Sequence, residues 1–359
     1  MKLFTLFTLF FITSTASAGI NLDMRADHLT EQKYKDTSDS DVDAKGYFKM
    51  SRARMKFSGK LNDSLSAQAR LNFLETTTSK SSAGNTSKYI DFAELTHKID
   101  DSLSFSFGKL ADNGVFGFEG LTSTGDQYVT SAAYGVFGGY PYFTGAKASY
   151  TMGDNKLNAY MFNGASDDDK AQGRTGLGVD YRMVINESLK MMANYHIVPT
   201  QKDNSALSAS AQELDSNTIL LGFGAEYKMD AHTFQFDYLA DTLKEQSANA
   251  LAGAADKKDK TITSMVLNWK WKMSQWSPVA KVSLDTTKDT KVGGTEITDN
   301  KTQMALGAEY VPADDASFRY HIVYSQVSNK YDSGNAYTND KTTQGVITAG
   351  IRLNADLLK

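Results

Sequence analysis

Basic side chains alternate along one stretch of the sequence, and in this pattern they could bind or steer anions. Arg52, Arg54 and Lys56 occupy positions i, i+2 and i+4. On a β-strand these three side chains point to the same side. Arg70 lies in the next stretch of this kind and Arg25 in the preceding one. Because cations so close together repel one another, the pattern predicts a basic wall that faces water or carboxylates.

A glycine-rich segment, 111–141, carries carboxylates that could face this basic wall. They are Asp112, Glu119 and Asp126. A basic wall opposite an acidic segment would set a field across the space between them and act on ions there. The alternative is a solvated polar interior without a focused field.

Other reactive residue types form no catalytic pattern. The histidines show no recurring spacing with a serine or a carboxylate, and no glycine-rich phosphate loop joins a strand to a helix. Asp167, Asp168 and Asp169 could hold Ca²⁺, but consecutive acids point apart and are more often solvated. We therefore expect no enzyme activity and no cofactor, with one weak candidate for calcium.

The composition excludes several classes of protein. The chain has 359 residues, no cysteine, and 38 Lys and Arg against 42 Asp and Glu. It can form no disulfide scaffold or thiolate metal site, and its balanced charge gives no reason to expect nucleic acid. Beyond the first dozen residues, no apolar stretch approaches the roughly 18 residues that a spanning helix needs.

The first residues have the features of a secretory signal. Lys2 precedes an apolar run, 3–12, and Ala16-Ser17-Ala18 forms an A-x-A cleavage site. We expect residues 1–18 to be a cleaved signal peptide and 19–359 to form the exported domain. A short buried strand or helix is the alternative.

From residue 19 onward, apolar residues recur at every second position in short runs, which is the signal of half-buried strands. Short turns and long polar connections separate these runs in alternation. Sixteen strands are predicted, at 20–27, 46–59, 65–75, 88–99, 103–110, 142–152, 156–163, 173–183, 189–198, 217–228, 232–241, 260–271, 276–286, 301–311, 316–326 and 342–354.

Alternating connection lengths are typical of a barrel that crosses a bilayer, with short periplasmic turns and long extracellular loops. Aromatic residues near both ends of the predicted strands fit the two membrane interfaces. We therefore predict an all-β, transmembrane, 16-stranded antiparallel β-barrel. A soluble β-sandwich or β-helix is the alternative. Sixteen strands enclose a lumen wide enough for water.

The segment 111–141 is the longest connection and would be the third extracellular loop. Its glycines permit tight bends, and its aromatic residues need a surface to pack on. Folding into the lumen would satisfy both and would narrow the barrel. Alternatively, the loop contacts a neighbouring subunit or covers the barrel mouth.

Two stretches of the sequence resemble the general porins of Gram-negative outer membranes and are similar to the related phosphate-selective porins. The first runs Phe48-Lys49-Met50-Ser51-Arg52-Ala53-Arg54-Met55-Lys56-Phe57-Ser58-Gly59-Lys60-Leu61, and the second Ser104-Phe105-Ser106-Phe107-Gly108-Lys109-Leu110. The resemblance implies a barrel of sixteen strands, usually trimeric, with the third loop folded into the pore opposite an arginine cluster. By this likeness Arg52, Arg54 and Arg70 belong to the cluster, and Asp112 and Glu119 are the loop carboxylates. The last residues, Leu357-Leu358-Lys359, lack the terminal aromatic residue of the family.

These observations predict an outer-membrane porin for passive diffusion of ions and small hydrophilic solutes, constricted by 111–141 against the basic wall. Weak selectivity with a slight preference for anions is expected, because a charge acts most strongly where a pore is narrowest. Expected partners are the lipid bilayer with its lipopolysaccharide and two further copies of the chain in a homotrimer. The alternatives are a structural or adhesive barrel, or a more anion- or phosphate-selective porin.

Overall fold

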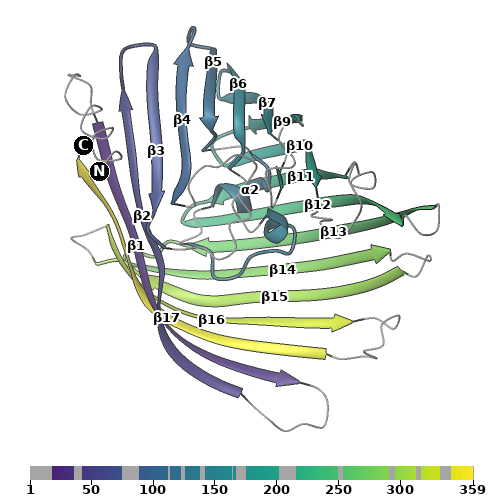
Figure 1. Cartoon of the computed structure of the whole chain (residues 1–359). Helices are drawn as coiled ribbons and strands as arrows, with labels where there is room; N and C mark the ends of the chain where they lie inside the picture. Colours follow the sequence, from purple (N-terminus) through teal and green to yellow (C-terminus); the bar gives the residue numbers. More distant parts are fainter. Residues whose placement is uncertain are drawn as a thin grey trace, which may run out of the picture.

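Long antiparallel strands pair edge to edge and form a closed ring in this computed structural model (Figure 1). The structure describes residues 18–35, 43–74, 89–111, 114–122, 126–137, 142–163, 165–166, 175–201, 216–249, 254–290, 296–312, 317–331 and 341–358. The predicted signal peptide, apart from its last residue, lies outside the described residues.

Sixteen strands make up the wall, and a short extra strand, β8 (Ala165–Ser166), pairs in parallel with β10. The wall strands are β1 (Ala18–Lys35), β2 (Asp43–Lys60), β3 (Leu65–Asn72), β4 (Ile90–Lys98), β5 (Leu103–Lys109), β6 (Thr144–Met152), β7 (Asn155–Asn163), β9 (Thr175–Val184), β10 (Leu189–Gln201), β11 (Ser216–Met229), β12 (His232–Asn249), β13 (Ala254–Trp271), β14 (Trp276–Thr290), β15 (Glu296–Tyr310), β16 (Phe318–Tyr331) and β17 (Lys341–Leu358).

The first and last strands close the ring. β1 pairs with β17 from Ile20 opposite Leu358 to Lys35 opposite Thr342, and with β2 along its other edge. Every other wall strand pairs antiparallel with its neighbours along the chain. The predicted 16-stranded antiparallel barrel is therefore confirmed.

Several strands are longer than predicted, among them β12 and β13, which extend to Asn249 and back to Ala254 instead of stopping at 241 and starting at 260. In the first strand the alternating pattern ends at residue 27, yet β1 continues to Lys35. Residues 28–35 are mostly polar, so their side chains give no apolar alternation, and the strand is extended there by backbone pairing with β2 and β17. The short fifth strand, by contrast, matches β5.

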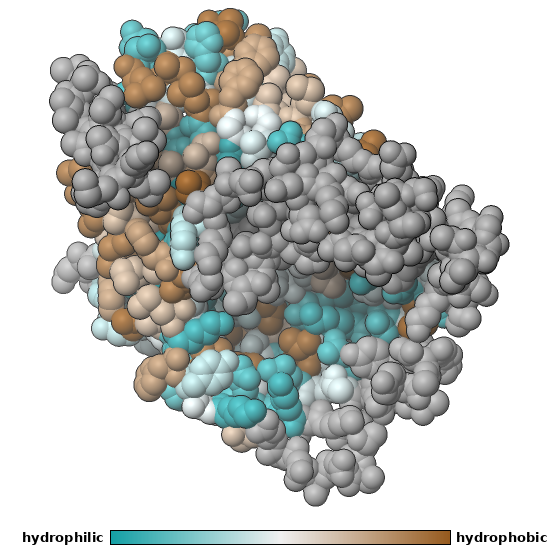
Figure 2. All heavy atoms as spheres, in the orientation of Figure 1, coloured by the Kyte–Doolittle hydropathy of each residue, from teal (hydrophilic) through white to brown (hydrophobic). Residues whose placement is uncertain are grey.

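The two faces of the wall differ in character. On β15, Met304 is 40% exposed, whereas Gln303 beside it is 3% exposed and faces the interior. Large apolar side chains are exposed in the same way on most strands, as expected for a surface that faces lipid. Figure 2 shows hydrophobic residues on the outside of the ring and hydrophilic residues within it. Among the described residues, no helix is long and apolar enough to cross a membrane.

Part of the inner wall is apolar, which the alternating pattern does not predict. Inward-facing Val198, Leu220 and Leu239, on β10 to β12, form a buried cluster with Phe116 and Tyr134 of the segment between β5 and β6. This segment contains the short helix α2 (Gly117–Leu121) and the 3-10 helix η2 (Tyr134–Phe137). In Figure 1, α2 lies within the ring of strands.

Candidate pore constriction

The helix α2 is fixed to the inner wall by a carboxylate of β12. The backbone N–H groups of Phe118 and Glu119 each donate to one oxygen of Asp237, both at 2.8 Å. Gly117 precedes them with φ of 60°. A Cβ at this position would lie 2.2 Å from Asp237 Oδ1, so only glycine allows the close approach.

Glu119 is one of the predicted loop carboxylates, and it is buried against β14. It accepts hydrogen bonds from Lys281 Nζ at 2.6 Å and from the backbone N–H of Ser131 at 2.9 Å. The Glu119 side chain is 1% exposed and that of Lys281 is 9% exposed. This pair joins the loop to the wall through a charge contact from which water is excluded.

Asp126, another predicted loop carboxylate, contacts two arginines on the last strands. Its Oδ1 accepts from Arg319 at 2.5 Å and from Arg352 at 2.9 Å. Burial raises the pKa of Asp126, but the attraction of the two guanidinium groups outweighs it and lowers the pKa to about 2. Asp126 is therefore ionised at every physiological pH.

The predicted basic residues of β2 and β3 pair with carboxylates of neighbouring strands. Arg52 lies 2.5 Å from Asp23, and Arg54 and Arg70 lie 3.1 and 2.9 Å from Asp91. Each arginine is buried or mostly buried. Because Arg54 and Arg70 share Asp91, their charges are only partly offset by this carboxylate.

Arg25 and Lys56 complete the predicted wall. Arg25 bonds Asp27 at 2.9 Å, and its guanidinium lies over the ring of Tyr128 at 4.8 Å from the centroid. Tyr128 is a loop residue, so this contact brings the loop to the basic wall. Lys56 is half-buried on β2.

Arg352 connects Asp126 of the loop with Asp23 of the basic wall. It bonds Asp23 at 2.8 Å as well as Asp126, and Asp23 also holds Arg52. The structure therefore brings Arg25, Arg52 and Asp126 into one network. Arg54 and Arg70 form a separate group around Asp91, where Arg70 also stacks over Phe92 and Tyr142.

The direct cationic partners of the loop carboxylates come from strands that the sequence analysis did not single out. They are Lys281, Arg319 and Arg352, and Lys270 lies beside them, 2.6 Å from Glu309. Each is an isolated charge within an alternating run. Only its position on the inward-facing side of its strand could have identified it. Asp112 and Asp167 to Asp169 lie outside the described residues. Within the described ranges, no group of three or more His, Asp or Glu side chains could hold a metal ion.

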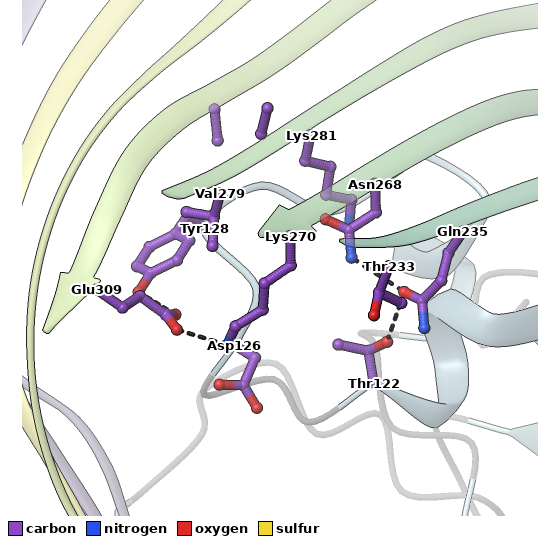
Figure 3. A pocket seen from close by; sticks show the side chains of 12 residues that line it. Thr122, Asp126, Tyr128, Thr233, Gln235, Asn268, Lys270, Val279, Lys281 and Glu309 are labelled. Carbon is purple, nitrogen blue, oxygen red and sulfur yellow. Dashed lines mark hydrogen bonds and ion pairs between the residues drawn. The ribbon is translucent and has the colours of Figure 1, made fainter. Parts of the chain in front are cut away.

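A cavity of about 200 Å³ lies between the loop and the wall (Figure 3). In it, Lys270 and Asp126 carry charges of opposite sign, and their side chains are 41% and 32% exposed. Figure 3 shows the end of Lys270 beside Asp126, with amide and hydroxyl groups on the other side of Lys270, where the Asn268 amide donates to Gln235 Oε1 at 3.0 Å. The lining residues are Thr122, Asp126, Tyr128, Thr233, Gln235, Asn268, Lys270, Val279, Ala280, Lys281, Ala305 and Glu309.

Comparisons with known proteins agree with this architecture. Residues 20–183 match the family model of the phosphate-selective porins O and P. No curated protein sequence gives a significant match.

Solved structures of barrels with about the same length are similar in fold. OmpT, an outer membrane protein of Vibrio cholerae, is 13% identical, with 96% of this chain and 99% of that chain covered and a TM-score of 0.63. The outer membrane channel DcaP of Acinetobacter baumannii is 13% identical over 94% and 99%, with a TM-score of 0.61. The anion-selective porin from Comamonas acidovorans is 12% identical over 95% and 100%, with a TM-score of 0.60.

A closed ring of sixteen antiparallel strands with an apolar outer face and charged groups inside is the architecture of a transmembrane β-barrel. Over residues 20–183 the chain is similar to the phosphate-selective porins, and its fold is similar to that of the solved outer-membrane structures.

Proposed function

We propose that small hydrophilic solutes and ions diffuse through this barrel along a path narrowed by residues 114–122 and 126–137. The observation that carries the proposal is the set of contacts between this segment and inward-facing side chains on β12, β14, β16 and β17. These contacts support a constriction in which the segment lies across the interior and occupies space that water would otherwise fill.

Weak selectivity with a slight preference for anions fits the charges along this path. Glu119 is buried and paired with Lys281, so it contributes little net charge, whereas Arg54 and Arg70 share the single carboxylate of Asp91. Lys270 is more exposed than Asp126. A stronger preference for anions or phosphate is the second candidate, and the family match over 20–183 favours it.

The test of the constriction is solute permeation through a variant whose loop is released. Asp237→Ala removes both acceptors of the α2 backbone N–H groups. In liposome-swelling assays, this variant should admit larger sugars than the wild type. Gln275→Ala, at a turn remote from α2, serves as the control for folding. Equal size limits for the wild type and Asp237→Ala would contradict the proposal.

We further propose that three copies assemble through the part of the wall formed by β3 to β5. These strands have seven to nine residues, half the length of β12 or β13. A wall made of such short strands is better covered by a neighbouring subunit than by lipid. An OmpT structure in trimer form, 13% identical with a TM-score of 0.56, has a similar fold. Cross-linking in mild detergent that yields only monomer would contradict the assembly.

Conduction, rather than catalysis or adhesion, is the activity we assign to the barrel. We propose that it works without a cofactor, because charged side chains inside the barrel pair with one another. The cleavage of residues 1–18 and the calcium site at Asp167 to Asp169 remain predictions.

A further inference from the structure

The cavity in Figure 3 lies close to the short turns of the barrel. Two of its lining residues show this: Thr233 is the second residue of β12, and Lys270 is the second-to-last residue of β13. β12 begins after the turn at 230–231, and β13 ends at the turn at 272–275. In outer-membrane barrels such short turns are periplasmic, so the cavity lies toward the periplasmic end of the barrel interior.

The charges that line this cavity balance one another. They are the two lysines Lys270 and Lys281 and the two carboxylates of Asp126 and Glu309. An anion bound at Lys270 would also lie close to both carboxylates, because Lys270 is 2.6 Å from Glu309 and its end lies beside Asp126. An amine bound at Asp126 would meet Lys270 in the same way. Like charges this close repel each other, so the lining favours a ligand without charge.

Hydroxyl and amide groups make up the rest of the polar lining. Thr233 stands opposite Lys270 in the register of β12 and β13, and Gln235 stands opposite Asn268 in the next inward-facing row. The Asn268 amide donates to Gln235 Oε1 at 3.0 Å, and Gln235 donates to Glu226 at 2.8 Å. These bonds fix the orientation of both amides. The lining thus offers an amide oxygen as acceptor, a hydroxyl that both donates and accepts, and an ammonium group as donor.

Another part of the lining is apolar. Val279 and Ala305 are buried in a cluster with Val129, and Tyr128 packs against this cluster. In Figure 3, Val279 and Tyr128 lie on one side of Lys270, and the amides lie on the other. A sugar ring has the same division, with hydroxyl groups around its edge and C–H groups on its faces. Its hydroxyl groups can accept from an ammonium group and donate to a carboxylate without separating an ion pair.

We propose that this cavity binds one uncharged sugar ring, with hydroxyl groups bonded to Lys270, Asn268 and Thr233 and C–H groups against the apolar residues. The volume of about 200 Å³ is below the roughly 300 Å³ at which pockets for drug-sized ligands begin, so a single ring fits and a chain of sugars does not. The inference rests on the proposed function, because solutes reach the cavity through the barrel interior. Binding is weak, since a site on a conducting path must release its ligand.

The proposal is tested by saturation-transfer NMR on the folded full chain, with D-glucose as the probe and a detergent that has no sugar head group. This measurement reports binding whether or not the barrel conducts. The wild type should show saturable transfer to glucose. Thr233→Val keeps the shape of the side chain and removes one neutral hydrogen bond, so it should weaken glucose binding about fivefold. Lys270→Met removes a charged donor and should weaken binding about ten- to hundredfold.

Lys228→Met is the matched control. Lys228 stands opposite Thr233 on the other neighbouring strand, its side chain is 49% exposed, and it lies outside the cavity lining. This variant should bind glucose as the wild type does, and heat-modifiable mobility shows that each variant is folded. Equal glucose binding by the wild type and Lys270→Met would overturn the proposal.

Competition experiments separate the sugar from charged ligands. Phosphate or glycine, added at the concentration of glucose, should leave the glucose signal unchanged. Displacement by phosphate would reveal an anion site and displacement by glycine a zwitterion site, and either result would overturn the proposal. Single-channel recording of the same protein tests the proposed function separately. A wild type that conducts but binds no glucose contradicts this inference alone, whereas a wild type that binds glucose without conducting supports the site and contradicts the channel.

Discussion

Replacing Lys270 by glutamine should move the selectivity of the channel toward cations. The Lys270 side chain is 41% exposed to the cavity, whereas its partner Glu309 is 1% exposed. Glu309 also accepts hydrogen bonds from Arg319 and Tyr128 at 3.1 and 3.0 Å. The variant therefore removes an accessible positive charge without leaving a buried carboxylate unpaired.

The size of the effect follows from Coulomb's law. Two unit charges 4 Å apart in bulk water interact by about 1 kcal/mol, which changes the local concentration of an ion about fivefold. Loss of the lysine lowers the concentration of anions and raises that of cations. Salt at about 0.1 M screens the charge over about 10 Å, so ions farther away respond less. We expect the ratio of anion to cation permeability to fall about two- to fivefold.

Arg54→Gln is the matched control for this prediction. It also removes one positive charge, but Arg54 is 5% exposed and shares Asp91 with Arg70. The measurement is the reversal potential of single channels under a tenfold salt gradient. An unchanged potential for Lys270→Gln, or a larger shift for Arg54→Gln, would show that ions do not pass along the cavity in Figure 3.

Three further predictions concern the docking of the loop. The pKa of Asp126 is lowered to about 2 from about 3.9 in an unfolded chain, so its stabilising effect is complete above about pH 4 and is lost as the pH falls through about 2. Protection of the loop from hydrogen exchange should decline only between about pH 4 and pH 2, and a decline near pH 6 would contradict this. Gly117→Ala should cost about 1–3 kcal/mol of backbone strain and displace α2 from Asp237, seen as noisier conductance steps; quiet steps of wild-type size would argue against it. Glu119→Gln should lower the unfolding free energy by about 3–5 kcal/mol, because Lys281 is left buried without its carboxylate. In denaturant unfolding, the double variant Glu119→Gln/Lys281→Met should lose less stability than Glu119→Gln, and equal losses would refute the pairing.

The wall of the barrel could be predicted from the sequence because a strand with one face toward lipid alternates at every second residue. The runs at 65–73 and 301–311 show this pattern, and both are strands. Where the strand leaves the apolar belt, as in residues 28–35 of β1, the pattern disappears although backbone pairing continues.

The ion pairs of the constriction could not be predicted in the same way, because they depend on strand register and on the path of the loop. Arg319 and Arg352 stand opposite each other although 32 residues, including a connection, separate them in the sequence. Alternation indicated that Arg52 and Arg54 face inward, but not that Asp23 and Asp91 are their partners. The apolar inner cluster around Leu220 could not be predicted either, because alternation in a barrel wall predicts polar residues on the inner face.

The central claim is that this barrel is an aqueous channel. It is tested most directly by single-channel recording of the folded wild-type chain in a planar bilayer. We predict steady, ohmic conductance steps whose size increases with salt concentration. Correctly folded, heat-modifiable protein that inserts into the bilayer without producing steps would contradict the claim.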